Sequence, residues 1–69
     1  MKIKVNGEEK TIQSNKGAIP LTETINILGY SSNKVVVELN NLIVNSDGWG
    51  TKIVEDGDKL EIVSIVGGG

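Results

Sequence analysis

A single short helical pattern, lying between segments with the period of β-strands, constrains the fold of this chain most. Leu21, Ile25 and Leu28 recur at intervals of four and three residues, with mostly polar residues between them. Pro20 suits the first position of a helix, and Gly29 suits the left-handed residue that ends one. The sequence therefore predicts one amphipathic helix whose apolar stripe has to be covered by another part of the chain.

The first twelve residues predict a β-hairpin. Ile3 and Val5 alternate with lysines, and Ile12 closes a second short run. A two-residue turn at Asn6-Gly7 would place charged residues of the second strand opposite core residues of the first. A turn centred on Gly7-Glu8 pairs Ile3 with Ile12 instead, so we expect this second register.

Two further strands are expected in the middle of the chain. The valine-rich segment 34–39 has the residue types of a strand, and Glu38 has to face water, which turns Val36 outward as well. Residues 42–44 can supply a brief additional strand. We expect Trp49, the only tryptophan, to cover the edge of the core.

The last strand is expected over residues 59–66, where Glu61 has to point to solvent. Val63 and Ile65 then share its outward face. Isolated exposed aliphatic residues are common in strands, so these two can simply be good strand formers. Together with the outward Val36 they can also form a patch on which a partner docks. The sequence leaves both interpretations open.

One helix and four or five strands can bury their apolar faces only by packing on one another. The sequence therefore predicts an α+β domain of the β-grasp kind, in which a mixed four- to five-stranded sheet packs on one helix. We expect residues 1–66 to form this domain and residues 67–69 to be a flexible C-terminal tail.

The tail consists of Gly67, Gly68 and Gly69, after which the sequence stops. Three residues without side chains lose much conformational entropy on ordering and offer nothing to pack. Such a segment can thread a narrow channel and present its terminal carboxylate where a Cβ would clash. The alternative is a frayed end or an added remnant without a role.

The composition argues against most kinds of catalysis by the chain alone. It contains neither cysteine nor histidine, which removes disulfides, the usual zinc ligands and the commonest general base. Asp56-Gly57-Asp58 lacks the ligand spacing of a calcium loop, so we expect a turn there. We therefore expect no metal, no cofactor and no enzymatic activity of its own.

Charge and hydropathy patterning also limit the partners and the location. The net charge is −2 and no basic stripe is present, which disfavours nucleic acid. The first residues alternate and resemble neither a signal peptide nor a membrane span. We therefore expect a cytoplasmic protein that does not interact with membranes.

Over nearly its whole length the chain resembles the sulfur carrier proteins of thiamine biosynthesis, the ubiquitin-like ThiS family. The resemblance is carried by residues 5–8, 28–30, 35–40, Trp49, 56–58 and, most specifically, 61–69. Pro20 departs from the family, which more often has a helix-capping Ser or Thr at this position.

The resemblance implies that the chain is a carrier, a co-substrate of partner enzymes. In this family an ATP-dependent adenylating enzyme (ThiF-like) activates the terminal glycine carboxylate, here that of Gly69. The carboxylate becomes a thiocarboxylate with sulfur from a sulfur donor protein, and thiazole synthase (ThiG-like) uses that sulfur to form the thiazole. Gly67 and Gly68 would be the slender stalk. The residues expected to bind these partners are Val36, Val63, Ile65 and Val66.

Other functions fit a β-grasp domain with a glycine tail. The sulfur carrier of molybdopterin synthesis shares the fold and a terminal diglycine, and the partner enzyme rather than the tail selects the sulfur acceptor. A modifier would transfer the same activated glycine to a lysine. A plain protein-interaction module would have an idle tail, because a fold does not determine a function.

Overall fold

The structure, a computed structural model, describes residues 1–13, 17–31 and 33–65. The elements follow one another in the order β1 (Lys2–Val5), β2 (Glu8–Thr11), β3 (Ala18–Pro20), α1 (Leu21–Ile27), β4 (Val35–Leu39), β5 (Leu42–Val44), the 3-10 helix η1 (Ser46–Gly48), β6 (Ile53–Glu55) and β7 (Lys59–Ser64).

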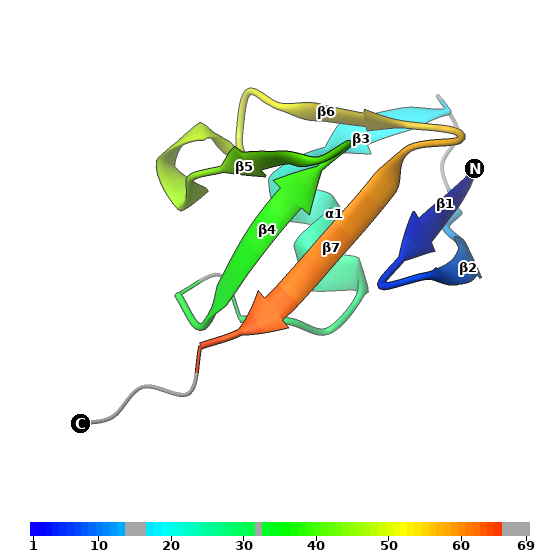
Figure 1. The fold of residues 1–69 in the computed structure, drawn as a ribbon. Helices are drawn as coiled ribbons and strands as arrows, with labels where there is room; N and C mark the ends of the chain where they lie inside the picture. Colours follow the sequence, from blue (N-terminus) through cyan, green and yellow to red (C-terminus); the bar gives the residue numbers. More distant parts are fainter. Residues whose placement is uncertain (14–16, 32, 66–69) are drawn as a thin grey trace.

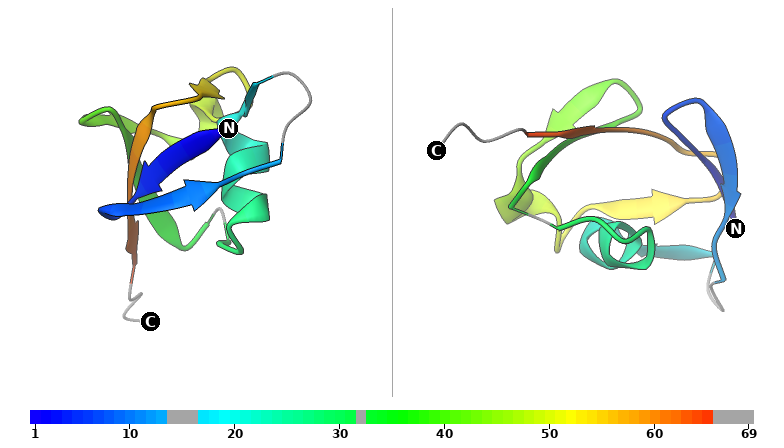
Figure 2. Two further views of the ribbon diagram at one scale, coloured as in Figure 1. Left: turned by 90° about the vertical axis from the view of Figure 1, so that its right-hand side faces the viewer. Right: turned by 90° about the horizontal axis from the view of Figure 1, so that it is seen from below.

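Five strands form a mixed sheet in the spatial order β2-β1-β7-β4-β5. β1 and β7 run parallel, whereas the other neighbours in this sheet run antiparallel. Helix α1 lies across one face of the sheet, and the small sheet of β3 and β6 lies in the same layer as the helix (Figure 1 and Figure 2). The predicted two-layer α+β fold, a mixed sheet packed on one helix, is confirmed.

The core lies between these two layers. Leu21 and Ile25 of the predicted helical stripe are fully buried, and Leu28 is half-buried against the core. Thr24 is buried beside them, and its hydroxyl donates a hydrogen bond to the carbonyl of Pro20 at 3.1 Å. The buried apolar residues are Ile3, Val5, Ile12, Ile19, Leu21, Ile25, Val35, Val37, Leu39, Trp49, Val54, Leu60 and Ile62.

The helix begins one residue later than the sequence suggests. Pro20 has an extended backbone, with φ −60° and ψ 148°, and is the N-cap rather than the first helical residue. No side chain caps this end. Pro20 also ends β3, so the backbone leaves the strand and enters the helix at one residue.

The end of the helix is determined by glycine, as predicted. Gly29 has φ of 88°, and its N–H donates to the carbonyl of Asn26 at 3.1 Å. The N–H of Tyr30 donates to the carbonyl of Ile25, also at 3.1 Å. These two bonds form a Schellman motif, which satisfies carbonyls that the helix itself leaves free.

The first hairpin has the register that the sequence argument rejected. β1 and β2 pair Ile3 with Lys10. Asn6 and Gly7 form the turn, and their φ values of 52° and 84° are both positive, as a type I′ turn requires. The expected pairing of Ile3 with Ile12, and with it the turn one residue later, is therefore wrong.

The position of β2 in the sheet explains this error. β2 is an edge strand and all of its residues are exposed, so the charges opposite Ile3 and Val5 remain in water. The Asn-Gly turn also matches the twist of the paired strands. Ile12 is buried at the far end, where its N–H and carbonyl exchange hydrogen bonds of 2.8 Å with Met1.

The small sheet of β3 and β6 was not predicted. It places Ile19 opposite Val54, and both side chains are buried in the core. Each strand has three residues, which is too short for a period-2 pattern to be visible. The two segments are also far apart in the sequence, so neither indicates the other.

The middle of the chain follows the expected pattern. Val35, Val37 and Leu39 of β4 are buried, whereas Val36 is exposed. Trp49 is 2% exposed, and its indole N–H donates to the carbonyl of Val44 at 2.7 Å. The tryptophan is therefore a core residue whose polar atom is satisfied.

Replacing Gly29 by alanine is expected to lower the free energy of unfolding by about 1 kcal/mol. A Cβ at this position meets no atom within 4 Å, so the cost comes from the φ of 88° alone. Gly50→Ala is the matched control, because its Cβ also meets no atom within 4 Å and its backbone is not left-handed. Urea unfolding would contradict this account if the two variants were equally stable.

Candidate functional site

The face of the five-stranded sheet that is turned away from α1, called the outer face below, has apolar residues near the end of the last strand. Val36 of β4 lies directly opposite Val63 of β7, and their side chains are 40% and 60% exposed. Ile65 follows β7 and is 52% exposed. Its N–H donates to the carbonyl of Lys34 at 2.7 Å, which continues the pairing with the segment before β4.

A second row of the outer face combines one aliphatic and two acidic residues. β4 pairs Glu38 with Glu61 of β7 on one side and with Ile43 of β5 on the other. Ile43 is 67% exposed, and both glutamates are half-buried. The sequence alone does not indicate that Ile43 belongs to this face, because its side follows only from the register across the turn at Asn40-Asn41.

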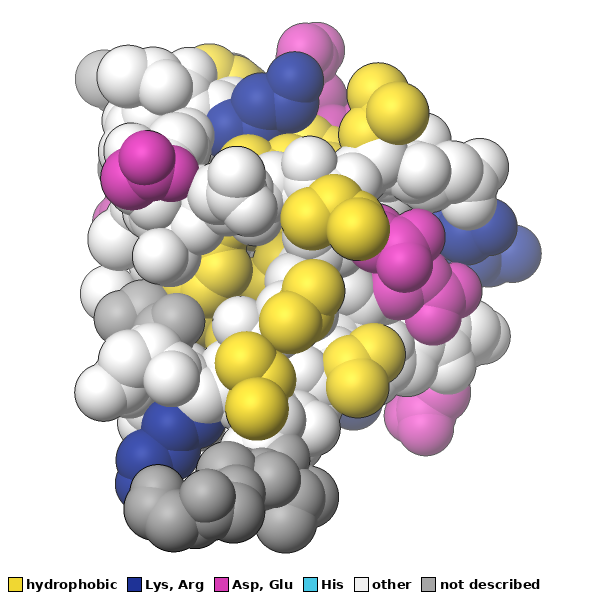
Figure 3. Space-filling view, turned by 60° about the vertical axis from the view of Figure 1, so that its left-hand side comes forward, with side chains coloured by type: hydrophobic (Ala, Val, Ile, Leu, Met, Phe, Trp, Pro, Cys, Tyr) yellow, Lys and Arg dark blue, Asp and Glu magenta, His cyan; other side chains and the backbone are white. Residues whose placement is uncertain are grey.

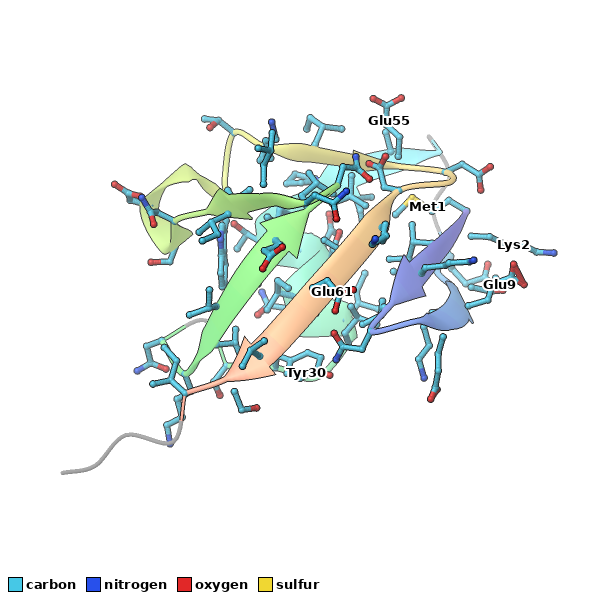
Figure 4. The ribbon with its side chains drawn as sticks, in the orientation of Figure 1. Met1, Lys2, Glu9, Tyr30, Glu55 and Glu61 are labelled. Carbon is cyan, nitrogen blue, oxygen red and sulfur yellow. The ribbon has the colours of Figure 1, made fainter. Side chains whose placement is uncertain are left out.

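Along β7, the outer face therefore changes from acidic at Glu61 to apolar at Val63 and at Ile65, which follows the strand. Figure 3 shows apolar side chains gathered on this side of the molecule, with carboxylates beside them. Figure 4 shows Glu61 in the middle of β7. Among the described residues the one salt bridge joins Lys10 to Glu8 at 3.7 Å, so neither Glu38 nor Glu61 is in an ion pair there.

The predicted tail, Gly67, Gly68 and Gly69, and the preceding Val66 lie outside the described residues. Ile65 is the last residue that the structure describes. Two of the apolar residues of the outer face, Val63 and Ile65, thus come shortly before the predicted tail in the chain. β7, which leads to it, is the central strand of the sheet (Figure 1).

The aspartates of the turn at residues 56–58 bind backbone groups. Asp56 Oδ1 accepts a hydrogen bond from the N–H of Lys2 at 2.6 Å, and Asp58 Oδ2 accepts one from the N–H of Glu55 at 2.8 Å. Gly57 has φ of 89°, which suits a glycine in a tight turn. These contacts support the interpretation of this segment as a turn.

Within residues 1–13, 17–31 and 33–65 no group of three or more acidic side chains gathers as a metal site would require. The described helices are also too short or too polar to cross a bilayer. The exposed aliphatic side chains of the outer face are therefore the candidate interaction site among the described residues.

A sequence model of the ThiS family matches residues 3–69. The chain belongs to this family. The match begins in β1 and includes the three C-terminal glycines, so it covers both the described elements and the predicted tail. The resemblance noted from the sequence is thereby confirmed.

A solved structure supports the same assignment. The chain is similar to the crystal structure of a thiamine biosynthesis protein (ThiS) from Geobacter metallireducens, with a TM-score of 0.84 and 30% identity. The comparison covers 100% of both chains. The mixed sheet over one helix is therefore the ThiS-family fold.

Curated relatives extend the comparison. A thiazole synthase of Paramagnetospirillum magneticum is 41% identical over 69 residues, which is 100% of this chain but 20% of that protein. The chain thus spans about a fifth of the length of this relative. An uncharacterized protein, ycf40, of Trieres chinensis is 37% identical over 65 residues, which cover 94% of this chain and 85% of that protein.

Two adjacent residues of β7 test the assignment of its faces. Val63→Asp is expected to lower the free energy of unfolding by at most about 1 kcal/mol, because the aspartate stays in water. Ile62→Asp is expected to cost several kcal/mol, since Ile62 is 5% exposed and a carboxylate there loses its hydration. Urea unfolding measures both changes. A large loss for Val63→Asp would show that the faces are assigned wrongly.

Proposed function

We propose that this chain is a sulfur carrier of thiamine biosynthesis, in which the carboxylate of Gly69 accepts and then delivers sulfur. The observation that carries the proposal is membership of the ThiS family over residues 3–69, the terminal glycines included. The structural similarity to a thiamine biosynthesis protein over the whole chain supports it.

The chemistry requires activation of the carboxylate by another protein. An oxygen of Gly69 attacks the α-phosphorus of ATP, which gives an acyl adenylate and releases pyrophosphate. Sulfide from a donor then attacks the acyl carbon and displaces AMP, which leaves a thiocarboxylate. A carboxylate is a poor electrophile until its oxygen becomes part of a good leaving group. The carrier itself therefore needs no catalytic side chain.

Gly67 and Gly68 would carry the reacting group into the active site of a partner. The absence of Cβ atoms allows close contact with another backbone on all sides of the chain. An alanine in this segment would add a methyl group where a narrow channel has no room. The adenylating enzyme would therefore select glycine through shape.

The outer face supplies the surface on which partner enzymes would dock. Val36, Val63 and Ile65 form its exposed apolar part, and Val66 would extend it. Gly69 is the fourth residue after Ile65, and an extended chain of four residues reaches at most about 14 Å. A partner that binds the apolar part therefore has to hold its reactive site within this reach.

The curated relatives support thiazole synthase as one partner. Thiazole synthases of Paramagnetospirillum magneticum and Magnetococcus marinus are 41% and 32% identical to the complete chain within a fifth of their own length. A carrier and the enzyme that consumes its sulfur would gain from being joined in one polypeptide, because joining raises their effective concentration. An adenylating enzyme, a sulfur donor protein and a cytoplasmic location complete the proposal.

The tail mechanism predicts that deleting Gly69 abolishes adenylation and that Gly68→Ala slows it at least about tenfold, which corresponds to roughly 1.4 kcal/mol in the transition state. Pyrophosphate exchange with ATP, catalysed by a ThiF-like enzyme from the same genome, measures both rates. Gly50→Ala is the control for adding a methyl group elsewhere in the chain. Wild-type exchange rates in both tail variants would rule out this mechanism.

Docking on the outer face predicts that Val63→Asp weakens binding to the adenylating enzyme at least about tenfold, because a carboxylate would be buried in an apolar contact. Ile27→Asp is the matched control, since Ile27 is 51% exposed but belongs to α1 in the other layer. Isothermal titration calorimetry compares the two variants. Equal affinities would place the docking surface elsewhere.

A further inference from the structure

Two asparagines begin the two-residue turns that join neighbouring strands of the main sheet. Asn6 follows β1 and Asn40 follows β4, and their φ values of 52° and 51° are both in the left-handed region. Glycine adopts this conformation with less strain than asparagine. Asparagine is common at the first position of such turns, but unlike glycine it also carries a side-chain amide that can bind a neighbouring strand.

Both side chains bind β7. At the start of this strand, Asn40 Oδ1 accepts a hydrogen bond from the N–H of Lys59 at 3.0 Å. Asn40 Nδ2 donates to Asp58 Oδ1 at 3.1 Å, and its backbone N–H donates to the carbonyl of Lys59 at 2.8 Å. Asn40 thus attaches the beginning of β7 to the end of β4.

Asn6 binds β7 further along, closer to the tail. Its backbone N–H donates to the carbonyl of Leu60 at 2.9 Å. Its Oδ1 accepts a hydrogen bond from the N–H of Ile62 at 2.7 Å, and its Nδ2 donates to the carbonyl of Ile62 at 3.1 Å. The side-chain amide therefore binds Ile62 as the peptide group of a neighbouring strand would.

This contact replaces strand pairing that β1 can no longer provide. The parallel register pairs Val5 with Leu60, after which the chain turns away into β2. In Figure 1 the end of β1 lies beside β7, and β7 continues past it. The backbone N–H and C=O groups of alternate residues in a strand point to the same edge, so after Leu60 and Ile62 the next residue facing β1 is Ser64. Among the described residues none forms a backbone hydrogen bond with Ser64 on this side.

On the other side β7 remains attached up to its end. β4 pairs with β7 as far as Val35 and Ser64, and the N–H of Ile65 donates to the carbonyl of Lys34 at 2.7 Å. Within the part of the chain that the structure describes, Asn6 thus makes the last attachment on the β1 side. Without it, the backbone of residues 62–65 would pair with β4 alone, and the buried side chain of Ile62 would be the only other attachment of this segment.

We propose that Asn6 is a positioning residue for the carrier reaction, because it holds β7 at Ile62 and so fixes the residues that follow, 63–65, relative to the rest of the sheet. The inference rests on the proposed function of Gly69. When the end of β7 has a defined position, Gly69 starts its approach to the active site of a docked enzyme from the same point in most encounters. A strand held on one side only would spread its end over more orientations, and fewer bound complexes would be reactive.

The test compares Asn6→Gly with Asn40→Gly in the full chain. Glycine accepts the positive φ at both positions, so each variant removes one side-chain attachment of β7 without straining the turn. Steady-state adenylation by a ThiF-like enzyme from the same genome gives kcat and KM for each carrier. Thermal unfolding followed by circular dichroism identifies a temperature at which both variants are folded, and the kinetics are measured there.

We expect Asn6→Gly to lower kcat about tenfold while KM changes less than about threefold, because the apolar part of the outer face is still paired to β4. Asn40→Gly is expected to leave kcat unchanged. An equal fall of kcat in both variants, or no fall in either, would overturn the positioning role and leave the carrier function standing. If the wild-type chain is not adenylated at all, the proposed function fails and the inference fails with it.

Discussion

The position of β7 between β1 and β4 is the constraint on which the rest of the structure depends. β7 is the last strand in the sequence, yet it is central in the sheet, parallel to β1 and antiparallel to β4. Its Leu60 and Ile62 are 0% and 5% exposed in the core under α1. Because the first and last strands pair here, the sheet is complete only when the C-terminal segment is in place.

This arrangement also determines what the domain can offer to a partner. Alternation along β7 sends Leu60 and Ile62 into the core and leaves Val63 on the outer face. The same strand then leads to the glycines that belong to the ThiS-family match. The proposed docking residues Val63 and Ile65 and the proposed reactive glycines are therefore close in sequence, and both follow from the central strand of the sheet. Under the proposed function the domain itself needs no catalytic side chain, because its partner enzymes would supply the reactive groups.

The inward and outward faces of single strands could be predicted, because they depend only on the alternation of neighbouring residues. Glu38 and Glu61 had to face water, and this identified the inward and outward residues of β4 and β7. The helix stripe and Gly29 were likewise visible, because periodicity and backbone conformation are properties of short segments. The exposure of Val36, Val63 and Ile65 followed from the same reasoning, whereas their role in binding stays a prediction.

Features that depend on the whole topology could not be predicted. The predicted register of the first hairpin was wrong because the charges opposite Ile3 outweighed the local Asn6-Gly7 turn signal, and the sequence does not show that β2 is an edge strand, where these charges stay in water. β3 and β6 are too short to show a period. The bond from Asn6 to Ile62 joins residues 56 positions apart, and no local pattern indicates such a contact.

Sulfur transfer to Gly69 is the central claim, and the intact mass of the carrier tests it most directly. The purified chain would be incubated with a ThiF-like adenylating enzyme from the same genome, ATP and sulfide, and the mass change would be located by fragmentation. The account predicts the mass gain that results from replacing one oxygen by sulfur, confined to Gly69. An unchanged mass, with an enzyme that is active on another carrier, would contradict it.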